Sequence, residues 1–427
     1  MEIMNYSKVS KKYNRATSSM KRIILNSIGI FIYSIIYTLR TFNIYFFRYP
    51  NAFGHQTMNV EYFARKIKAI SKINNPILIG IRHHEKTRNI SNNSLFEHHK
   101  RAGIKIINNK LLCLLLDIGL YFQKEQIEKK GGRKSTSFLT LTMAQYTTDP
   151  YVHILSNVAL PFDAHESSEL NNVLKKMCLK SGEYYIVLDR GKDYDKEKEK
   201  YSGNKIGYIY KNEHSSIKIQ FKAATVMKTH GISAVRMGYS PKKEPVRNKI
   251  IIDYPSKYRN SIGDIADLAL MNGCKFYVGP FSGVCAFAVS LKKPILLCNA
   301  FPWPWSTVPM GDTSIVMPKK LWLIKEKRMM TLQEMIGLEG HYSSKELTYS
   351  KEIFDSLSVE LISNTEDEIV GAVEEINNRI DGNWNGENYS LSSILSGCIG
   401  ESSQSYLSTF FAENNPDIMA NIQPDRR

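Results

Sequence analysis

Four polar side chains stand at the ends of apolar, β-prone runs in the C-terminal part of the chain: Arg190, Arg236, Asp253 and Ser282. Helical patterns separate these runs, and strands that alternate with helices predict a parallel sheet. Ligands of such sheets bind beyond the carboxyl ends of the strands, so we expect the four side chains to gather at one edge. Two arginines, a carboxylate and a hydroxyl suit a ligand with phosphate and hydroxyl groups.

The stretch around Ser282 has the strongest local pattern. Residues 273–301 predict a short strand, a tight turn, a helix over 284–291 and a second buried strand. Ser282-Gly283 opens that helix, where backbone N–H groups such as that of Val284 favour an anion. Glycine lets a phosphate approach the backbone closely. The alternative interpretation is an ordinary strand–helix unit in which Ser282 is a plain N-cap.

Charge and cysteine content narrow the classes of partner. The chain has 57 Lys and Arg against 41 Asp and Glu, a formal net charge of +16. This excess favours anionic partners, which are phosphates, acidic lipid or nucleic acid. The sequence has no zinc-finger spacing, helix-turn-helix signal or aromatic RNA-binding strand, so we do not expect nucleic acid. The six cysteines form no C-x-x-C pair and are interpreted as reduced core residues of a cytosolic protein.

The N-terminal part combines a basic segment, residues 1–22, with an apolar run, residues 23–39. As a helix the run would be about 26 Å long, at the short limit for crossing a bilayer. Its hydroxyl residues fall on one helical stripe, which favours a helix lying in the membrane interface. A spanning helix with a cytoplasmic basic segment would export the rest of the chain. We therefore interpret residues 20–48 as a monotopic anchor, with Tyr45, Phe46 and Phe47 at headgroup depth. The alternatives are a single span and a core helix.

The length of 427 residues favours two main domains. The pattern predicts an α/β protein in four parts: a basic segment with a membrane-associated helix (1–50), an N-terminal α/β domain (51–175), a C-terminal α/β domain (176–375) and a helical tail (376–427).

The basic loop at 129–136 departs from the phosphate-loop pattern. His83-His84 and His98-His99 have no carboxylate or Cys at ligand spacing, so we interpret them as surface residues and expect no metal site.

Several short motifs in this C-terminal part resemble a bacterial family of glycosyltransferases linked to surface-polysaccharide synthesis. They are an Arg-Met-Gly turn, an Ile-Asp-Tyr strand, a downstream arginine, a Ser-Gly turn and an Asn-x-x-Pro exit. Here they fall on Arg236, Met237, Gly238, Asp253, Tyr254, Arg259, Ser282, Gly283, Asn299 and Pro302. Gly54-His55 resembles the family's N-terminal Gly-His motif. The likeness extends over residues 205–325 and is patchy elsewhere, and Asp189 before Arg190 departs from the family pattern.

The resemblance implies a GT-B-like fold, in which two Rossmann-like domains face each other across a cleft. It implies that the C-terminal domain binds a nucleotide sugar without metal or cofactor, and it adds Gly238, Arg259 and Asn299 to the donor-binding residues. Arg190, Arg236 and the Ser-Gly turn would then neutralise the leaving diphosphate. Asp253 would accept a hydrogen bond from a ribose or sugar hydroxyl. Trp303 or Trp305 would stack on the base or, alternatively, pack over the core.

The acceptor hydroxyl needs a general base from the N-terminal domain. His55 is the candidate, because it follows a glycine in a loop and histidine is the side chain whose ordinary pKa lies near neutral pH. The alternative is a structural histidine. The sequence thus predicts a metal-independent glycosyltransferase at the cytoplasmic face of the bacterial inner membrane, acting on a glycan or lipid-linked acceptor. The alternatives are a non-catalytic nucleotide- or glycan-binding protein of a polysaccharide assembly system and a sugar-nucleotide epimerase of similar fold.

Overall fold

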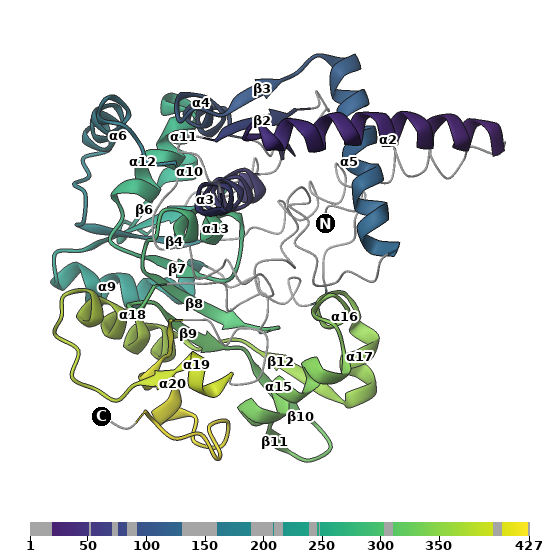
Figure 1. Cartoon of the computed structure of the whole chain (residues 1–427). Coiled ribbons are helices and arrows are strands. Elements are labelled where there is room, and N and C mark those ends of the chain that lie inside the picture. Colours follow the sequence, from purple (N-terminus) through teal and green to yellow (C-terminus); the bar gives the residue numbers. More distant parts are fainter. Residues whose placement is uncertain are drawn as a thin grey trace. The chain divides into compact units, whose positions relative to one another are not determined.

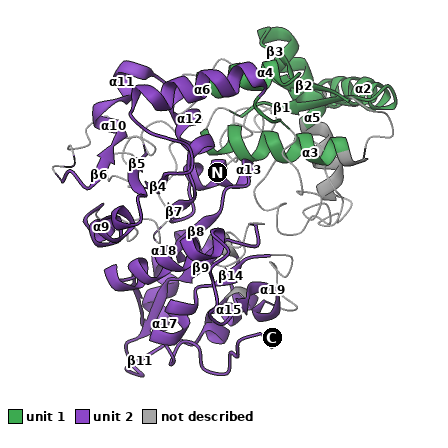
Figure 2. Ribbon diagram, turned by 90° about the vertical axis from the view of Figure 1, so that its left-hand side faces the viewer, with its two compact units in different colours: residues 1–162 green, residues 163–427 purple. Residues whose placement is uncertain are grey.

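The computed structural model describes residues 19–50, 53–70, 76–82, 92–129, 160–188, 208, 217–238, 246, 248–302, 311–395 and 404–425. The chain divides into two compact units, residues 1–162 and residues 163–427 (Figure 2). The division precedes helix α6 (Ala164–Lys176), which the sequence pattern had assigned to the N-terminal domain. The reason is that α6 packs against α12 (Ile265–Gly273) inside the second unit.

Unit 1 is built on a parallel sheet of three strands in the order β1-β2-β3. The strands are β1 (Ile44–Arg48), β2 (Ile77–Ile81) and β3 (Lys105–Ile107). Its helical segments are α2 (Ser19–Thr41), η1 (His55–Asn59), α3 (Val60–Ile70), α4 (Asn93–Arg101) and α5 (Lys110–Lys129). The α/β pattern predicted for this part of the chain is therefore confirmed, because the apolar periodicities match the elements that bury them.

Strand β1 corrects the interpretation of the N-terminal part. Residues 44–48 pair in register with β2 from Ile77 to Ile81, and Phe46 and Phe47 are buried in the core of unit 1. Tyr45 packs against the same core. The prediction that these aromatic residues lie at headgroup depth is wrong. Aromatic side chains gain similarly from a protein core and from lipid, so the sequence pattern did not distinguish the two environments.

Helix α2 is partly integrated into the same unit. Ile36 is fully buried with Phe46 and with Cys113 and Leu116 of α5, and Ile32 packs against this cluster. Among the described residues, one segment is long and apolar enough to cross a membrane, Ile23–Thr41, with a mean hydropathy of 1.6 and 11% of it buried. By length and composition it is a weak indication of membrane association.

Deletion of residues 1–48 is therefore expected to unfold unit 1, and not merely to release a membrane anchor. The deletion removes β1 and the apolar side chains that cover α5, and burial of each large apolar side chain stabilises a fold by about 1.5–3 kcal/mol. Hydrogen exchange of the truncated protein measures this. Fast exchange in β2 and β3 with slow exchange in unit 2 is the expected result. Retained protection of β2 would show that β1 is dispensable.

Unit 2 contains an eight-stranded sheet in the order β13-β14-β9-β8-β7-β4-β5-β6. All neighbouring strands from β14 to β6 are parallel, and β13 is antiparallel. The strands are β4 (Tyr184–Leu188), β5 (Ser233–Met237), β6 (Ile251–Asp253), β7 (Tyr277–Gly279), β8 (Ile295–Ala300), β9 (Ile315–Pro318), β13 (Tyr389–Ser390) and β14 (Tyr406–Leu407). The parallel sheet predicted for this part is confirmed.

The chain order along this sheet creates a switch point. From β4 the chain builds β5 and β6 on one side, and then crosses to build β7, β8 and β9 on the other (Figure 1). This is the strand order 3-2-1-4-5-6 of doubly wound nucleotide-binding sheets. In such sheets the ligand crevice lies beyond the carboxyl ends of the two strands at which the direction reverses, here β4 and β7.

The helical segments of this part are η4 (Ile217–Gln220), α9 (Phe221–Thr229), α10 (Tyr254–Lys257), α11 (Arg259–Ile262), α13 (Gly283–Ser290), α15 (Leu332–His341), α16 (Ser344–Tyr349), α17 (Lys351–Leu357), α18 (Glu366–Ile380), α19 (Leu391–Ile394) and α20 (Thr409–Asn414). A second, antiparallel sheet joins β10 (Lys320–Leu323) to β11 (Arg328–Met329) and β12 (Val359–Ile362).

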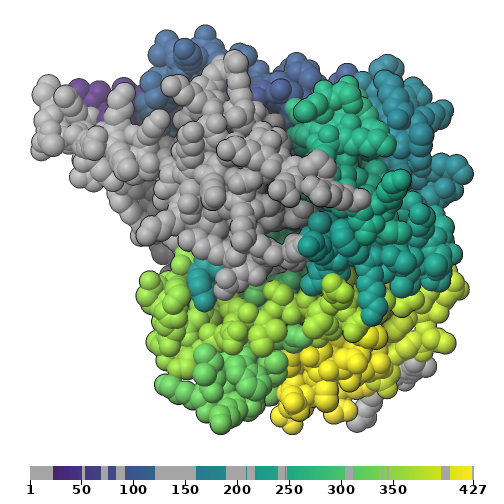
Figure 3. Space-filling view, turned by 180° about the vertical axis from the view of Figure 1, so that it is seen from behind, coloured from purple at the N-terminus to yellow at the C-terminus, as the bar shows by residue number. Residues whose placement is uncertain are grey.

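The C-terminal residues form part of unit 2, although the sequence pattern predicted a helical tail from residue 376. Strand β14 pairs with β9, and α20 packs against α18, so these residues extend the sheet. In the space-filling view they form a continuous part of the surface, coloured yellow (Figure 3). The buried Glu375 of α18 accepts hydrogen bonds from the Ser408 hydroxyl and the Phe410 amide, which ties the segment to the unit.

Candidate functional site

The carboxyl ends of β4 and β7 meet at a glycine. Gly279, the last residue of β7, has a φ of 152°, and a Cβ built on it would lie 3.0 Å from the Cβ of Leu188 at the end of β4. It would also lie 2.7 Å from the hydroxyl oxygen of Tyr277. Only glycine fits both the backbone angle and this approach. The two strand ends are therefore held close together at the switch point, and the chain leaves it directly into the Ser282 turn.

Ser282 is the N-cap of α13, as the sequence predicted. Its Oγ accepts a hydrogen bond of 3.1 Å from the amide of Cys285, and the Tyr277 hydroxyl lies 3.3 Å from the same oxygen. The backbone carbonyl of Ser282 accepts from the amide of Ala286. The first N–H groups of a helix, here those of Gly283 and Val284, have no intrahelical acceptor, and the helix dipole places positive potential beside them. Ser282 is thus a helix N-cap, and a phosphate at this turn remains a prediction.

Arg236 and Asp253 face each other on neighbouring strands. The two residues are in register between β5 and β6, and Arg236 Nη1 donates to Asp253 Oδ2 over 3.1 Å. The Arg236 side chain is 2% exposed and that of Asp253 is 10% exposed. Asp253 Oδ2 also accepts from the amide of Val246 at 2.8 Å, while Oδ1 has no hydrogen-bond partner within the described part of the chain. The arginine is therefore shielded from solvent, and the carboxylate keeps Oδ1 for a further hydrogen bond.

Arg259 and Gly238 occupy the same edge of the sheet. Arg259 lies at the start of α11 and pairs with the buried Asp267 at 3.2 Å and with Asp264 at 3.7 Å. Asp267 also accepts from the Tyr254 hydroxyl at 2.8 Å, so this arginine stabilises the segment behind β6. Gly238 follows β5 directly and has a φ of 123°, which favours glycine.

The side chain and backbone of Asn299 form hydrogen bonds within unit 2. Its side-chain oxygen accepts from the amide of Asn364 at 2.8 Å, and its own amide donates to the side-chain oxygen of Asn364 at 2.6 Å. The residue is buried and has a φ of 54°, a conformation that asparagine tolerates. This reciprocal pair fastens the end of β8 to Asn364, two residues before α18. Its predicted contact with a donor remains a prediction.

Some predicted features lie outside the described residues: Arg190 with the charged segment after it, Trp303, Trp305, His83-His84 and Cys398. The basic loop at 129–136 does so beyond Lys129. Of the remaining cysteines, Cys113, Cys274, Cys285 and Cys298 are buried free thiols, as predicted, and Cys178 is an exposed one. Burial raises the pKa of Cys285 and Cys298 to about 12, so these two thiols beside the switch point are unreactive at neutral pH.

His55 opens a π-helical turn, η1, in unit 1. Its Nδ1 lies 3.2 Å from Asn59 Nδ2, and the histidine is half-buried. The following residues of the turn, Gln56, Thr57, Met58 and Asn59, are buried. Single π-helical turns in proteins are frequent at functional sites, which makes the predicted position of the base consistent with the local geometry.

His98 and His99 are buried, so their interpretation as surface residues is wrong. His98 Nε2 lies 3.1 Å from the carbonyl oxygen of Leu160, and His99 Nδ1 lies 2.9 Å from the Tyr49 hydroxyl. Burial lowers the pKa of His99 well below its usual value, and the neighbouring His98 lowers it further. The pair is a structural element of unit 1. The described residues contain no group of three His, Cys, Asp or Glu that would hold a metal ion.

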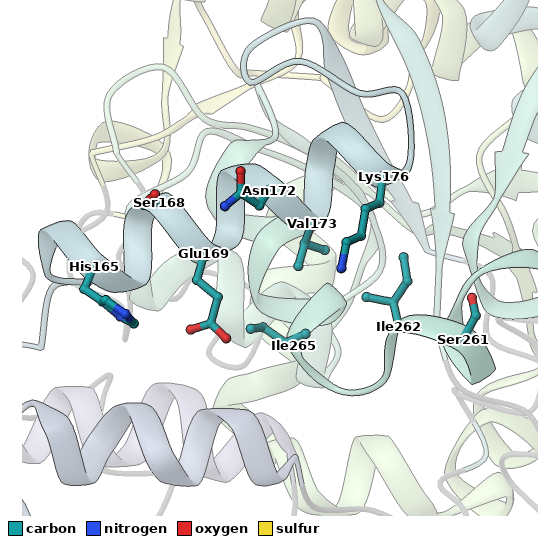
Figure 4. A pocket seen from close by; sticks show the side chains of 9 residues that line it. All are labelled: His165, Ser168, Glu169, Asn172, Val173, Lys176, Ser261, Ile262 and Ile265. Atoms are coloured by element: carbon teal, nitrogen blue, oxygen red, sulfur yellow. The ribbon is translucent and has the colours of Figure 1, made fainter.

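A cavity of about 550 Å³ in unit 2 was missed by the sequence analysis (Figure 4). It is lined by α6 and by the segment from α11 to α12: His165, Ser168, Glu169, Asn172, Val173, Lys176, Ser261, Ile262 and Ile265. The spacing of His165, Glu169, Asn172 and Lys176 places them on one helical face, a signal that was present in the sequence. None of the predicted donor-binding residues lines this cavity.

No protein-family model matches the chain, and a comparison with curated proteins finds no match. Among solved structures, the chain is similar to the ADP-heptose LPS heptosyltransferase II of E. coli, with 13% identity, a TM-score of 0.40 and coverage of 79% of this chain and 98% of that one. It is also similar to a family 9 glycosyl transferase from Veillonella parvula, with 13% identity, a TM-score of 0.43 and coverage of 78% and 96%.

A third similar structure is E. coli heptosyltransferase WaaC with ADP-2-deoxy-2-fluoro heptose, with 12% identity, a TM-score of 0.33 and coverage of 64% of this chain and 92% of that one.

Proposed function

We propose that this protein is a glycosyltransferase that moves a sugar from a nucleotide-sugar donor to a lipid-linked or surface-glycan acceptor. The observation that supports this most is the switch point of unit 2, where the glycine-ended strand β7 leads within four residues into the N-terminus of α13. Crevices of this kind bind nucleotides, and a helix N-terminus there suits a diphosphate. The donor is thus assigned to unit 2.

Each donor-site residue is given one role toward the nucleotide sugar. The N–H groups of Gly283 and Val284 would bind the diphosphate and stabilise the charge that develops on it as the glycosidic bond breaks. Asp253 would accept a hydrogen bond from a donor hydroxyl through Oδ1, and Arg236 would hold that carboxylate in position. We further propose that Arg190 adds positive charge, so that the transfer is metal-independent.

His55 would act on the acceptor. As a general base it would take the proton from the attacking hydroxyl, and its contact with Asn59 fixes the orientation of the ring. We place the reaction at the cytoplasmic face of the bacterial inner membrane, where nucleotide sugars and a lipid-linked acceptor meet.

The competing proposal is a non-catalytic protein that binds a nucleotide or a glycan. The observation that favours it is that Arg236, Arg259 and Asn299 are each paired inside unit 2. Both proposals place a ligand at the switch point, which in the competing proposal is a nucleotide or a glycan. They differ in whether turnover occurs.

His55→Gln is expected to lower kcat by about 10²–10⁴-fold, the usual contribution of a general base, without changing the donor Kd. The assay first screens nucleoside diphosphates and nucleotide sugars for thermal stabilisation of the purified protein. It then follows release of nucleoside diphosphate with a membrane lipid extract as acceptor. His341→Gln, an exposed histidine of α15, is the matched control.

Binding of a nucleotide sugar without any release in wild type would favour the non-catalytic proposal. Release by wild type that is unchanged in His55→Gln would exclude His55 as the base while leaving the transferase proposal in place. A transfer rate that falls on addition of EDTA would contradict metal independence.

A further inference from the structure

The exposed apolar surface of the protein is concentrated on two neighbouring helices. Among the described residues, every large exposed hydrophobic side chain except Ile77 and Ile324 lies on α2, on the residue after it, or on the first turns of α5: Ile23, Ile24, Ile30, Phe31, Ile35, Tyr37, Phe42, Leu111, Leu112 and Leu114. Several are more than half exposed, with Phe31 at 65% and Leu111 at 67%. Soluble monomers rarely leave such a set uncovered, so this two-helix surface indicates a binding partner.

Helices α2 and α5 pack against each other, and Figure 1 shows that they cross. A Cβ on Gly119 of α5 would lie 2.5 Å from Cγ2 of Ile32, so the two helices approach closely at this glycine. On the inner side Ile36 of α2 and Leu116 of α5 share one core. The exposed residues therefore belong to a single rigid helix pair and not to a detached segment.

Three hydroxyl groups of α2 donate hydrogen bonds to the helix itself. The hydroxyls of Ser27 and Ser34 donate to the carbonyl oxygens of Ile23 and Ile30 at 3.0 and 2.9 Å, and Thr41 donates to Thr38 at 2.6 Å. A hydroxyl that is bonded to its own helix enters an apolar medium at a lower cost than one that loses a water partner. The stripe of hydroxyl residues is thus compatible with contact to lipid.

The charge of the N-terminal sequence points to an anionic partner. Glu2 is the only acidic residue among the first 60, whereas that segment contains eight Lys and Arg. Helix α5 begins with Lys110 and has no acidic residue in its first turn, and Asp117 is buried and paired with Arg48 at 3.4 Å. An apolar helical face with basic flanks is the pattern of a segment that lies in an anionic bilayer interface.

We propose that α2 and the N-terminal half of α5 together form a monotopic docking surface for an anionic lipid bilayer, with Leu111, Leu112 and Leu114 as its second half. Because Ile32 and Ile36 hold α2 on α5, α2 lies along the membrane and does not span it. This deepens the membrane association that accompanies the proposed function, and it rests on that proposal only for its biological purpose.

The double substitution Leu111→Gln/Leu114→Gln tests the role of α5, which no membrane signal in the sequence indicated. Sedimentation with vesicles of phosphatidylcholine and phosphatidylglycerol measures partition. Wild type is expected to bind these vesicles, more weakly at high salt and in pure phosphatidylcholine, and the double variant to bind at least about tenfold more weakly, since each buried CH₂ contributes to partition. Ile324→Gln, at an exposed isoleucine outside the surface, is the matched control and binds as wild type.

Phe31→Trp distinguishes a helix on the membrane from a helix through it. Quenching of the new tryptophan by lipids brominated at different acyl positions is expected to be strongest for the shallowest bromine. The strongest quenching by the deepest bromine would overturn the monotopic geometry. Equal partition of wild type and the Leu111→Gln/Leu114→Gln variant, or no vesicle binding by wild type, would overturn the proposal.

A dimeric wild type that the double variant converts to a monomer, without vesicle binding, would overturn it in favour of a second copy as the occupant. Circular dichroism and nucleotide-sugar titration of the same variants confirm that fold and donor site are intact. Vesicle binding needs no donor, so failure of this proposal is separable from failure of the transferase proposal.

Discussion

Arg236→Met lowers the free energy of unfolding of unit 2 by about 3–5 kcal/mol, the cost of leaving one partner of a buried ion pair without the other. Asp253 is 10% exposed and its Oδ2 already accepts from a backbone amide, so its charge has little access to water once the guanidinium is removed. Urea unfolding of the variant, followed by circular dichroism, measures the loss.

The double substitution Arg236→Met/Asp253→Leu removes both charges of the pair together. It is expected to recover much of the stability, because replacement of a whole buried pair by apolar residues is often neutral. Arg328→Met, which breaks the exposed pair with Glu334, is the matched control and is expected to change stability little. A single variant as stable as wild type would show that Asp253 is solvated, and then Arg236 would be free to contact the donor directly.

Gly283→Val weakens binding of the nucleotide-sugar donor by about tenfold to a hundredfold, because a branched side chain meets the diphosphate at the start of α13. A charge-assisted hydrogen bond contributes about 1.5–3 kcal/mol, and the valine removes at least one such contact. Gly283 is the first residue of α13 and is not among the glycines with positive φ, so valine is compatible with the backbone. Isothermal titration with the donor found in the screen measures the loss.

Two further variants are compared with Gly283→Val. Ser282→Ala removes the cap on Cys285 and is expected to cost about 1 kcal/mol of stability with a small change in affinity. Gly337→Val, in the middle of α15 where a Cβ would have no atom within 4 Å, controls for the loss of a helical glycine. Equal donor affinity of wild type and folded Gly283→Val would leave Ser282 as a plain N-cap and remove the phosphate from this turn.

The sequence by itself determined the elements around the candidate site. The strand–turn–helix–strand order of residues 273–301, the cap at Ser282 and the strand that ends at Asp253 all appear as predicted. Each depends on local properties, which are the period of apolar residues, the φ preference of glycine and the hydrogen bond that a serine offers to the next turn. Those properties act over a few residues and can therefore be read in order along the chain.

The tertiary structure alone decided which elements became neighbours. The strand order that brings β4 beside β7, and the register that buries Arg236 against Asp253, arise from pairings between residues far apart in sequence. The same holds for the run from Tyr45 to Phe47, which entered the sheet of unit 1, and for His98 and His99, which entered its core. Apolar and aromatic residues gain similarly from lipid, from a sheet or from a core, so composition does not distinguish these environments and only the packing of the folded chain does.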